Sequence, residues 1–250
     1  MDLQLEGRVA IVTGASRGLG RSSVTALVAE GAKVLAVART TEALESLVAE
    51  SPEGSVVAVT CDMKDRDQVA ALPAKAIEAF GRIDVVVNNA GIAPAGRFTD
   101  LGDDVWREVF EVNVFAPVTL ARAAGEHFLA QGSGKVINIA STSGILGKPT
   151  LVAYSSSKGA VLQMTKALAG EWAGKGIQVN AIAPGAYETD AQSAVVEDAE
   201  ILKRRLRKIP AGRMGDPDEI GPLVCLLSST ASDFVTGSVL VADGGESSKL

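Results

Sequence analysis

The feature that most constrains the fold is a glycine-rich turn that directly follows a short run of β-branched apolar residues. The run spans residues 8–13, and the turn carries Gly14, Gly18 and Gly20. Apolar residues at helical spacing follow the turn as far as Gly31, a residue type that commonly ends helices. This order predicts a βα unit whose backbone can approach a pyrophosphate and point a helix N-terminus at its charge. A glycine-rich connection that binds no ligand is the alternative.

The rest of the chain alternates between apolar runs of strand length and longer helical patterns. Alternation without repeats or linkers predicts a single doubly wound α/β domain over residues 1–250, a Rossmann fold in which helices cover both faces of a parallel sheet of seven strands. We expect residues about 186–215, which are polar and only partly helical, to form a variable lid over the substrate. Further strands are expected at 33–38, 55–61, 84–87, 135–140, 177–183 and 237–241, and two long helices at 101–131 and 151–173.

Composition and charge argue against several classes of protein. The net charge is −6, which does not favour nucleic-acid binding, and a single histidine, His127, does not favour a multi-histidine metal site. No apolar run reaches the length of about 18 residues that spans a membrane, and the acidic N-terminus lacks the features of a signal peptide. Cys61 and Cys225 lie far apart in apolar runs, which favours buried free thiols and a cytoplasmic protein.

The end of the second expected strand bears on the choice of dinucleotide. Many folds of this type place a carboxylate there to bind a ribose 2′-hydroxyl, but this chain has Ala38 followed by Arg39. Together with Arg17 in the glycine turn, Arg39 could bind a 2′-phosphate through charge-assisted hydrogen bonds. The sequence therefore favours NADP(H) over NAD(H), with two solvated surface arginines as the alternative.

Tyr154 and Lys158 are four residues apart in the second long helix, which places them on one face of it. A phenol with a pKa of about 10 is a poor acid or base at neutral pH, and a nearby ammonium lowers that pKa. The pair could then exchange a proton with a carbonyl or an alcohol. A tyrosine beside a solvated lysine is the alternative when this spacing is taken alone.

Two further polar residues have positions that suit a catalytic site. Ser141 follows the fifth expected strand, at the edge of a parallel sheet where ligands bind. Asn113 lies among apolar residues of the first long helix, just before Pro117. We expect Pro117 to kink this helix and to free a main-chain carbonyl for water. A hydrogen-bonded core asparagine is the alternative.

Together these motifs resemble those of the short-chain dehydrogenases/reductases over essentially the whole chain. The chain is most similar to bacterial members of its own length, including 3-oxoacyl-(acyl-carrier-protein) reductases and gluconate 5-dehydrogenases. The resemblance implies an NADP(H)-dependent oxidoreductase that interconverts a ketone and a secondary alcohol by hydride transfer. It rests on Thr13-Gly14-x3-Gly18-x-Gly20, Asn88-Asn89-Ala90-Gly91, Asn113, Ser141, Tyr154-x3-Lys158, Pro184-Gly185 and Asp243-Gly244-Gly245.

The resemblance also implies a role for each matching position. Tyr154 would be the general acid in reduction and the general base in oxidation, while Lys158 would lower its pKa and hold the nicotinamide ribose. Ser141 would bind the substrate oxygen, and Asn113 would anchor a water that relays protons to Lys158. All four are present, which argues against the alternative of a non-catalytic dinucleotide sensor or structural subunit. The implied cofactor-binding residues are Gly14, Ser16, Arg17, Gly18, Leu19, Gly20, Arg39, Asp62, Met63, Asn89, Ala90, Gly91, Tyr154, Lys158, Pro184, Gly185, Tyr187 and Thr189.

The resemblance implies a small carbonyl or alcohol substrate, with a sugar acid, a polyol and a 3-oxoacyl thioester as candidates. Acyl-carrier reductases tend to carry a basic residue near the end of the first long helix, where this chain has Gly132, and this difference weakens the fatty-acid interpretation. We interpret the basic run 203–208 as a solvated helix face, with attraction of an anionic substrate as the alternative. The expected pocket residues are Ala93, Pro94, Thr142, Ile145, Leu146 and Tyr187.

The two long helices carry more apolar residues than one face of a sheet is expected to cover, which indicates an interface. The resemblance implies that these helices pair across one two-fold axis and that the last strand and the C-terminal tail form a second. Two perpendicular two-folds predict a D2 homotetramer, with a monomer as the alternative. The candidate interface residues are Trp106, Phe110, Phe115, Leu120, Leu162, Leu168 and Trp172.

Overall fold

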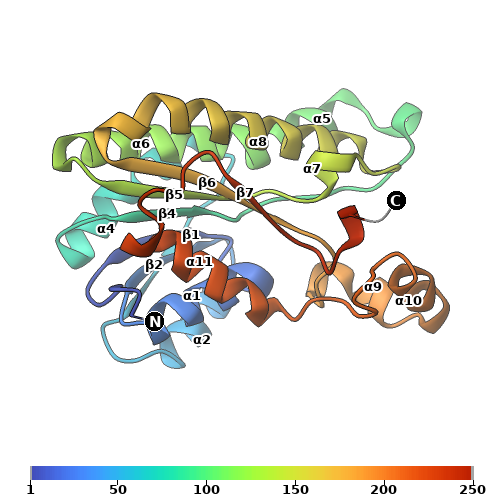
Figure 1. Ribbon diagram of the computed structural model, residues 1–250, viewed down its shortest axis with the longest axis horizontal. Helices are drawn as coiled ribbons and strands as arrows, with labels where there is room; N and C mark the ends of the chain where they lie inside the picture. Colours follow the sequence, from blue (N-terminus) through green and yellow to red (C-terminus); the bar gives the residue numbers. More distant parts are fainter. Residues whose placement is uncertain (1, 249–250) are drawn as a thin grey trace.

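The computed structural model describes residues 2–248 as one parallel sheet between two layers of helices (Figure 1). Within these residues the sheet has seven strands in the order β3-β2-β1-β4-β5-β6-β7, and all neighbouring strands pair in parallel. This architecture confirms the predicted fold class. The strands are β1 (Val9–Thr13), β2 (Lys33–Ala38), β3 (Val56–Thr60), β4 (Val85–Asn88), β5 (Gly134–Ile139), β6 (Ile177–Pro184) and β7 (Val239–Ala242).

Both faces of the sheet are apolar because helices cover each of them. One face packs against α1 (Gly18–Ala29), α2 (Thr41–Ala49) and α11 (Gly221–Ser228). The opposite face packs against the segments that precede and follow β4, and against the long helix between β5 and β6. Burial on both sides explains why the central strands are continuous β-branched runs rather than alternating ones. The helices of the second face are α3 (Arg66–Ala70), α4 (Leu72–Phe80), α6 (Ala116–Gln131) and α8 (Val152–Trp172).

The predicted first long helix is divided into three segments. It begins as α5 (Asp103–Phe110), continues as one π-helical turn, η2 (Glu111–Phe115), and ends as α6. The amide of Ala116 donates to the carbonyl of Glu111, five residues back, which defines the wider turn. Pro117 lies in the first turn of α6 and has no N–H to give to the carbonyl of Asn113, four residues earlier. The expected interruption therefore takes the form of a π turn that contains Asn113.

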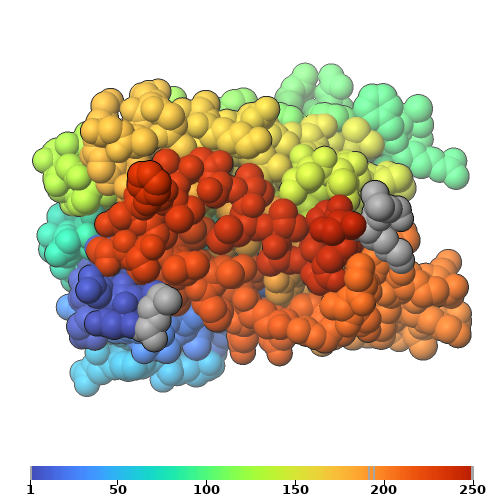
Figure 2. All heavy atoms as spheres, in the orientation of Figure 1, coloured from blue at the N-terminus to red at the C-terminus, as the bar shows by residue number. Residues whose placement is uncertain are grey.

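Residues 186–215 leave the sheet after β6 and return to it before η5 (Pro217–Ile220), and we call them the cap segment. Its two ends are joined, because the amide of Gly215 donates to the Ala186 carbonyl at 2.9 Å. The cap segment, orange in Figure 2, projects from the body. It contains η4 (Asp190–Gln192), α9 (Ser193–Val196) and α10 (Ala199–Leu206), and its apolar cluster comprises Ala186, Val195, Leu202, Leu206, Ile209 and Met214.

The short connecting elements lie at the ends of the sheet. They are η1 (Phe98–Asp100), α7 (Ser143–Leu146), η3 (Ala173–Lys175), η6 (Thr230–Ser232) and η7 (Glu246–Ser248). Cys61 and Cys225 are free and buried as predicted, and burial raises the pKa of Cys61 to about 11 and that of Cys225 to about 12. In the part of the chain that the structure describes, no helix has the length and apolar character needed to cross a bilayer.

The predicted surplus of apolar surface on the long helices is only partly present. Leu120, Leu162 and Trp172 are at most 8% exposed, so that part of the prediction is wrong. These side chains are buried because the helices pack closely on the sheet and on each other. Phe115 is 42% exposed, and two exposed apolar side chains, Phe234 and Val241, flank or belong to β7 at the edge of the sheet.

Candidate active site

A cleft of about 890 Å³ runs along the carboxyl ends of the strands. Because parallel strands all end at one edge, the turns that follow them lie side by side there. Every residue that the sequence nominated for cofactor binding lines this cleft, and so do Ser141, Tyr154 and Lys158. Asn113 does not line the cleft, since its side chain is buried at 1% exposure behind the turn that follows β4.

The glycine turn after β1 is packed tightly against the end of β4. A side chain at Gly20 would place its Cβ 2.1 Å from the carbonyl oxygen of Gly14. Any residue other than glycine at this position would therefore force the turn to move. Thr13 Oγ1 accepts from the amides of Asn89 and Ala90 at 3.0 and 3.1 Å, and Asn89 Nδ2 donates to the Thr13 carbonyl at 2.8 Å. Thr13 thus positions the turn, a role that sequence reasoning missed although Thr13 was part of the quoted motif.

The start of α1 is suited to hold an anion. Arg17 occupies the N-cap position, and no side chain caps the first turn of this twelve-residue helix. The uncapped residues Gly18, Leu19 and Gly20 line the cleft together with Ser16. The amides and the dipole of a helix N-terminus attract negative charge. This donor set therefore fits the pyrophosphate of a dinucleotide.

The two arginines that were proposed to bind a 2′-phosphate both line the cleft. The side chain of Arg17 is 74% exposed and lies 3.9 Å from the carboxylate of Asp190 in the cap segment. Arg39 directly follows β2 and is also exposed. Asp62 follows β3, and its Oδ1 accepts from the amide of Lys64 at 3.0 Å. The two guanidinium groups are thus available to an anion at the end of the cleft formed by the turns after β1 and β2.

The turn after β6 passes over the glycine turn. A Cβ on Gly18 would lie 3.2 Å from Cγ2 of Thr189, so the two segments are in close contact. The carbonyl of Pro184 accepts from the Thr142 amide at 3.0 Å, and Gly185 donates to the Ala242 carbonyl at 2.9 Å. These bonds hold the start of the cap segment between the ends of β5 and β7.

Tyr154 and Lys158 lie one turn apart on α8, and Lys158 Nζ is 5.7 Å from the centroid of the tyrosine ring. The lysine is 4% exposed, and its Nζ donates to the carbonyl of Ile139 at 2.7 Å. Burial lowers the pKa of Lys158 to about 8. Ser141 follows β5, and its Oγ accepts from the amide of Ser143 at 3.0 Å.

The pKa of Tyr154 departs from the sequence-based expectation. Burial raises this pKa, and the hydrogen bond to the Ser141 side chain acts in the opposite direction. The net direction is thus opposite to the expected lowering, and Lys158 is not among the groups that shift the pKa of Tyr154 in the chain alone. The physical reason is that both groups are desolvated, which disfavours the phenolate as well as the ammonium.

The side chain of Asn113 is fully hydrogen-bonded. Its Oδ1 accepts from the amide of Ile92 at 2.9 Å, and its Nδ2 donates to the Ile92 carbonyl at 2.9 Å and to Ser157 Oγ at 3.0 Å. These bonds fasten the turn after β4 to α8. The main-chain carbonyl of Asn113 is different, because the residue that would supply its α-helical donor is Pro117.

Beyond Ser141 and Tyr154 the cleft continues toward the cap segment. Of the expected pocket residues, Ala93, Thr142, Leu146 and Tyr187 line the cleft. Pro94 and Ile145 do not, so that part of the prediction is wrong. Four charged residues line this end, which are Lys148, Arg205, Lys208 and Glu246. Sequence reasoning missed Lys148 and Glu246, whereas Arg205 and Lys208 belong to the basic run 203–208.

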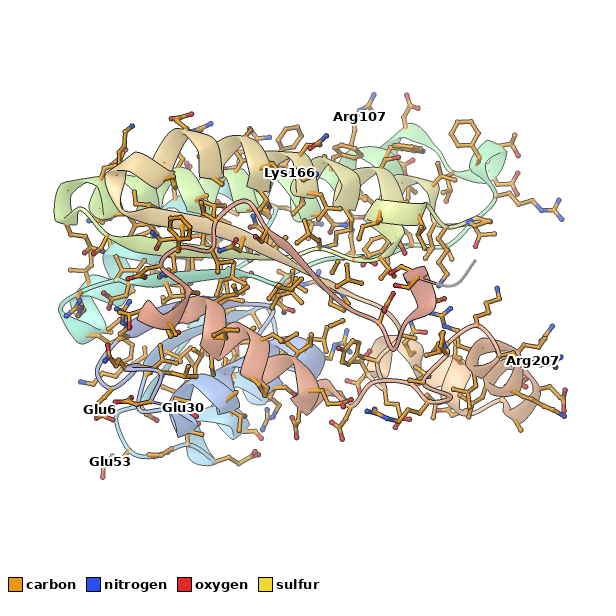
Figure 3. All side chains as sticks on the ribbon, viewed as in Figure 1. Glu6, Glu30, Glu53, Arg107, Lys166 and Arg207 are labelled. Carbon is orange, nitrogen blue, oxygen red and sulfur yellow. The ribbon has the colours of Figure 1, made fainter. Side chains whose placement is uncertain are left out.

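The basic run 203–208 is divided between two surfaces. Arg205 and Lys208 line the cleft, whereas Lys203 and Arg207 border a separate shallow hollow on α10. Arg207 lies at the outer end of the cap segment (Figure 3). Residues three or four apart share a helix face, so the run is divided between two faces. The interpretation of the run as a solvated face is wrong for Arg205, whose side chain is 16% exposed, whereas Lys208 is exposed and also lines the cleft.

Comparisons with known proteins agree with this fold and site. Residues 14–247 match the protein family described as Enoyl-(Acyl carrier protein) reductase. A 2-dehydro-3-deoxy-D-gluconate 5-dehydrogenase of Pseudoalteromonas atlantica is 41% identical over 249 residues, with 96% of each chain covered. A 3-oxoacyl-(acyl-carrier-protein) reductase of Thermotoga maritima is 37% identical over 245 residues, which cover 97% of this chain and 99% of that one.

A solved structure is similar over the whole length. The gluconate 5-dehydrogenase of Burkholderia cenocepacia, crystallised in complex with NADP and tartrate, matches with a TM-score of 0.93 and 35% identity. The match covers 100% of this chain and 98% of that chain. The fold and the cleft define an α/β oxidoreductase. The chain belongs to the short-chain dehydrogenase/reductase family.

Proposed function

We propose that this protein is an NADP(H)-dependent oxidoreductase that interconverts a ketone and a secondary alcohol on a sugar acid. One observation carries the proposal: a single cleft joins the glycine turn and both arginines to Ser141, Tyr154 and Lys158. A dinucleotide held at one end would place its reactive ring near the acid–base residues at the other.

Different residues of the cleft would bind different parts of the cofactor. The first turn of α1 would hold the pyrophosphate, and Arg17 and Arg39 the 2′-phosphate. NADP(H), when bound, supplies or accepts the hydride. Asp62 and Met63 would contact the adenine. Asn89, Ala90, Gly91, Pro184, Gly185, Tyr187 and Thr189 would surround the nicotinamide end, and Tyr154 and Lys158 its ribose.

Tyr154 would act as the general acid in reduction. Its raised pKa keeps the phenol protonated at neutral pH, so the proton is present at Oη when the substrate oxygen needs it. Ser141 would donate a hydrogen bond to that oxygen and orient it. Lys158 carries its positive charge below a pH of about 8, where it would stabilise negative charge on the tyrosine. The main-chain carbonyl of Asn113 would hold the water that resupplies the proton.

A sugar acid is favoured over an acyl thioester on an acyl carrier protein. Two of the three relatives described above are named as dehydrogenases of gluconate or of a gluconate derivative. Gly132 ends α6 with a φ of 69°, a conformation that favours glycine over the basic residue that would dock an acidic carrier. The cap segment would act as the lid that selects the substrate.

We further propose a cytoplasmic homotetramer. The buried free thiols fit a reducing compartment. The exposed Phe115, Phe234 and Val241 are apolar side chains that subunit contacts would cover.

The test is the oxidation of NADPH with a panel of ketones, followed by its near-ultraviolet absorbance. The panel includes ketogluconates, acetoacetyl thioesters, diketones and steroids. We expect the highest kcat/KM with a ketogluconate. Tight binding of NADPH without turnover of any ketone would contradict the proposal and favour a non-catalytic dinucleotide sensor.

A further inference from the structure

The order of the strands separates two charged ends of the cleft. Arg39 follows β2 and Ser141 follows β5, whereas Glu246 comes after β7 at the edge of the sheet. Because β5 lies between β2 and β7, Glu246 lies on the opposite side of Ser141 from Arg39. Charged groups around Glu246 are therefore remote from the two arginines proposed to hold the cofactor's 2′-phosphate, and they face the end of the cleft left for substrate.

Four charged residues from three segments of the chain line that end. Lys148 belongs to the turn between α7 and α8, Arg205 and Lys208 to the cap segment, and Glu246 to η7. Three cations and one carboxylate leave an excess of two positive charges. The cations act on one another: desolvation and the charges of Arg205 and Lys208 lower the pKa of Lys148, while Glu246 raises it. An anion at this end would relieve this repulsion.

Of the other carboxylates of the cleft, Asp62 follows β3 on the far side of Ser141, and two have cationic partners away from this cluster. Asp190 lies beside Arg17 at 3.9 Å, and Glu108 accepts from Lys64 Nζ at 3.1 Å. Neither therefore offsets the excess charge around Lys148.

Arg205 is held in place and keeps one donor unused. Its Nη1 and Nη2 both donate to the Glu246 carboxylate, the second at 2.6 Å, and the two side chains are 16% and 17% exposed. Glu246 is positioned in turn by Asp243, whose oxygens accept from the amides of Gly245 and Ser247 at 2.8 and 2.7 Å. Within residues 2–248, Arg205 Nε is buried and has no hydrogen-bond partner. A buried donor without an acceptor is costly, and an anionic oxygen would satisfy it.

Lys148 is fixed relative to the proposed catalytic tyrosine. Its main-chain amide donates at 3.1 Å to the hydroxyl of Ser155, the residue that follows Tyr154 in α8. The residue is exposed and lines the cleft. The turn is further tied to the segment after β4, because the amide of Gly96 donates to the Thr150 carbonyl at 2.9 Å.

We propose that Lys148, Arg205 and Lys208, with Glu246 positioning Arg205, form the subsite that binds the carboxylate of an anionic substrate. The inference rests on the proposed function, in which Ser141 and Tyr154 act on the carbonyl of the same molecule. The carboxylate receives charge-assisted hydrogen bonds from the two ammonium groups and from Arg205 Nε. Selection for a sugar acid over a neutral sugar of the same length follows from these contacts.

The kinetic test compares Lys148→Met and Lys208→Met with the matched control Lys203→Met, which removes the same charge from the other face of α10. The substrates are 5-keto-D-gluconate and L-sorbose, a neutral ketose with a hydroxymethyl group in place of the carboxylate. We expect each test variant to lower kcat/KM for 5-keto-D-gluconate relative to that for L-sorbose by about tenfold or more, because a hydrogen bond to a charged group is lost. Most of this loss should be an increase in KM for the acid. The control should preserve the ratio.

Three kinetic results would overturn the subsite. The first is an equal loss of kcat/KM for both substrates in the test variants. The second is that these variants raise KM for NADPH and leave KM for the acid unchanged. The third is that Lys203→Met lowers the preference for the acid as much as the test variants do. A calorimetric arm without turnover uses the protein with NADPH and the probes D-gluconate and D-sorbitol, because a reduced cofactor and an alcohol have no hydride to exchange. We expect wild type to bind gluconate more tightly than sorbitol, and both test variants to lose that preference.

The calorimetric arm also separates the two proposals. If wild type reduces no ketone but binds gluconate through Lys148 and Lys208, the proposed reaction fails and the subsite stands. If wild type reduces ketones but binds gluconate no better than sorbitol, the subsite is overturned and the reaction stands.

Discussion

At the scale of single residues, burial controls the acid–base groups of the site. Tyr154 and Lys158 are both withdrawn from water, and in each case desolvation is the first cause of the pKa shift. The two shifts have opposite directions because the phenolate is an anion and the ammonium a cation. Both shifts favour the neutral forms. Because water screens the two buried groups only weakly, the charge of a bound ligand will have a strong effect on their pKa values.

Tyr154→Phe keeps the aromatic ring and removes the proposed acid. We expect turnover to fall by about 10²-fold or more, the amount commonly lost with a general acid, while the affinity for NADPH persists. Steady-state kinetics and a fluorescence titration with NADPH measure the two quantities. Tyr187→Phe is the matched control, since it removes the only other tyrosine hydroxyl of the chain and keeps the backbone, and it should cost far less. Turnover near that of wild type in Tyr154→Phe would refute the assignment.

Lys158 links stability to pH. Its pKa is about 8 in the folded chain against an ordinary value of 10.5, so between these values the unfolded chain binds more protons. The cost of burying the charged lysine is present in full below pH 8 and disappears as the pH rises to 10.5. We expect the free energy of unfolding of wild type, relative to Lys158→Met, to rise by about 2 kcal/mol between pH 8 and 10. Urea unfolding of both proteins across this range measures it, and parallel curves would contradict the lowered pKa.

At the scale of elements, the glycine turn and α1 depend on close packing against β4. Gly20→Ala would place a Cβ 2.1 Å from the Gly14 carbonyl oxygen and 2.4 Å from Asn89 Nδ2, so the turn must move. We expect a loss of about 2 kcal/mol or more in unfolding free energy, together with weaker binding of NADPH. Urea unfolding and cofactor titration test this.

The control for that change is Gly170→Ala in α8, where an added Cβ meets nothing within 4 Å. Alanine is the better helix former, so we expect this variant to gain about 0.5–1 kcal/mol. An equal loss in both alanine variants would show that the tight contact at Gly20 is not the cause.

The turns after β1 and β2 act together in the choice of cofactor. Arg39→Asp reverses the charge beside the proposed 2′-phosphate, which should raise KM for NADPH and lower it for NADH. Adding Arg17→Ser should give a larger change than either single substitution, because both arginines would contact one phosphate. Steady-state kinetics with the two cofactors measure this. A wild-type preference for NADH would rule out the role given to the arginines.

At the scale of the whole molecule, the proposed assembly can be decided by mass. Light scattering at micromolar concentration should give four times the 25.7 kDa of one chain. The expectation now rests on exposed side chains such as Phe115, Phe234 and Val241, because Leu120, Leu162 and Trp172 are buried within the chain. A mass near 25.7 kDa would exclude the assembly, and a mass of two chains would leave one of the two interfaces.

Much of the site could be predicted because its signals are local. Most of the predicted cofactor-binding residues follow a strand or begin a helix, and parallel strands bring such positions to one edge. The glycine turn, the Tyr154–Lys158 pair and Ser141 could therefore be found by reading along the chain. Lys148 and Glu246 carried no comparable signal, since each is an ordinary surface residue type in a loop or a short turn.

The sequence by itself determined the order of the elements, the parallel sheet and the residues that meet at its carboxyl edge, since periodicity and turn chemistry act over short distances. Only the tertiary structure decided the pKa directions of Tyr154 and Lys158, the partners of Asn113 and the gathering of Lys148, Arg205, Lys208 and Glu246. The reason is physical: desolvation and charge clustering depend on which distant segments pack together, and no local pattern in the chain specifies that packing.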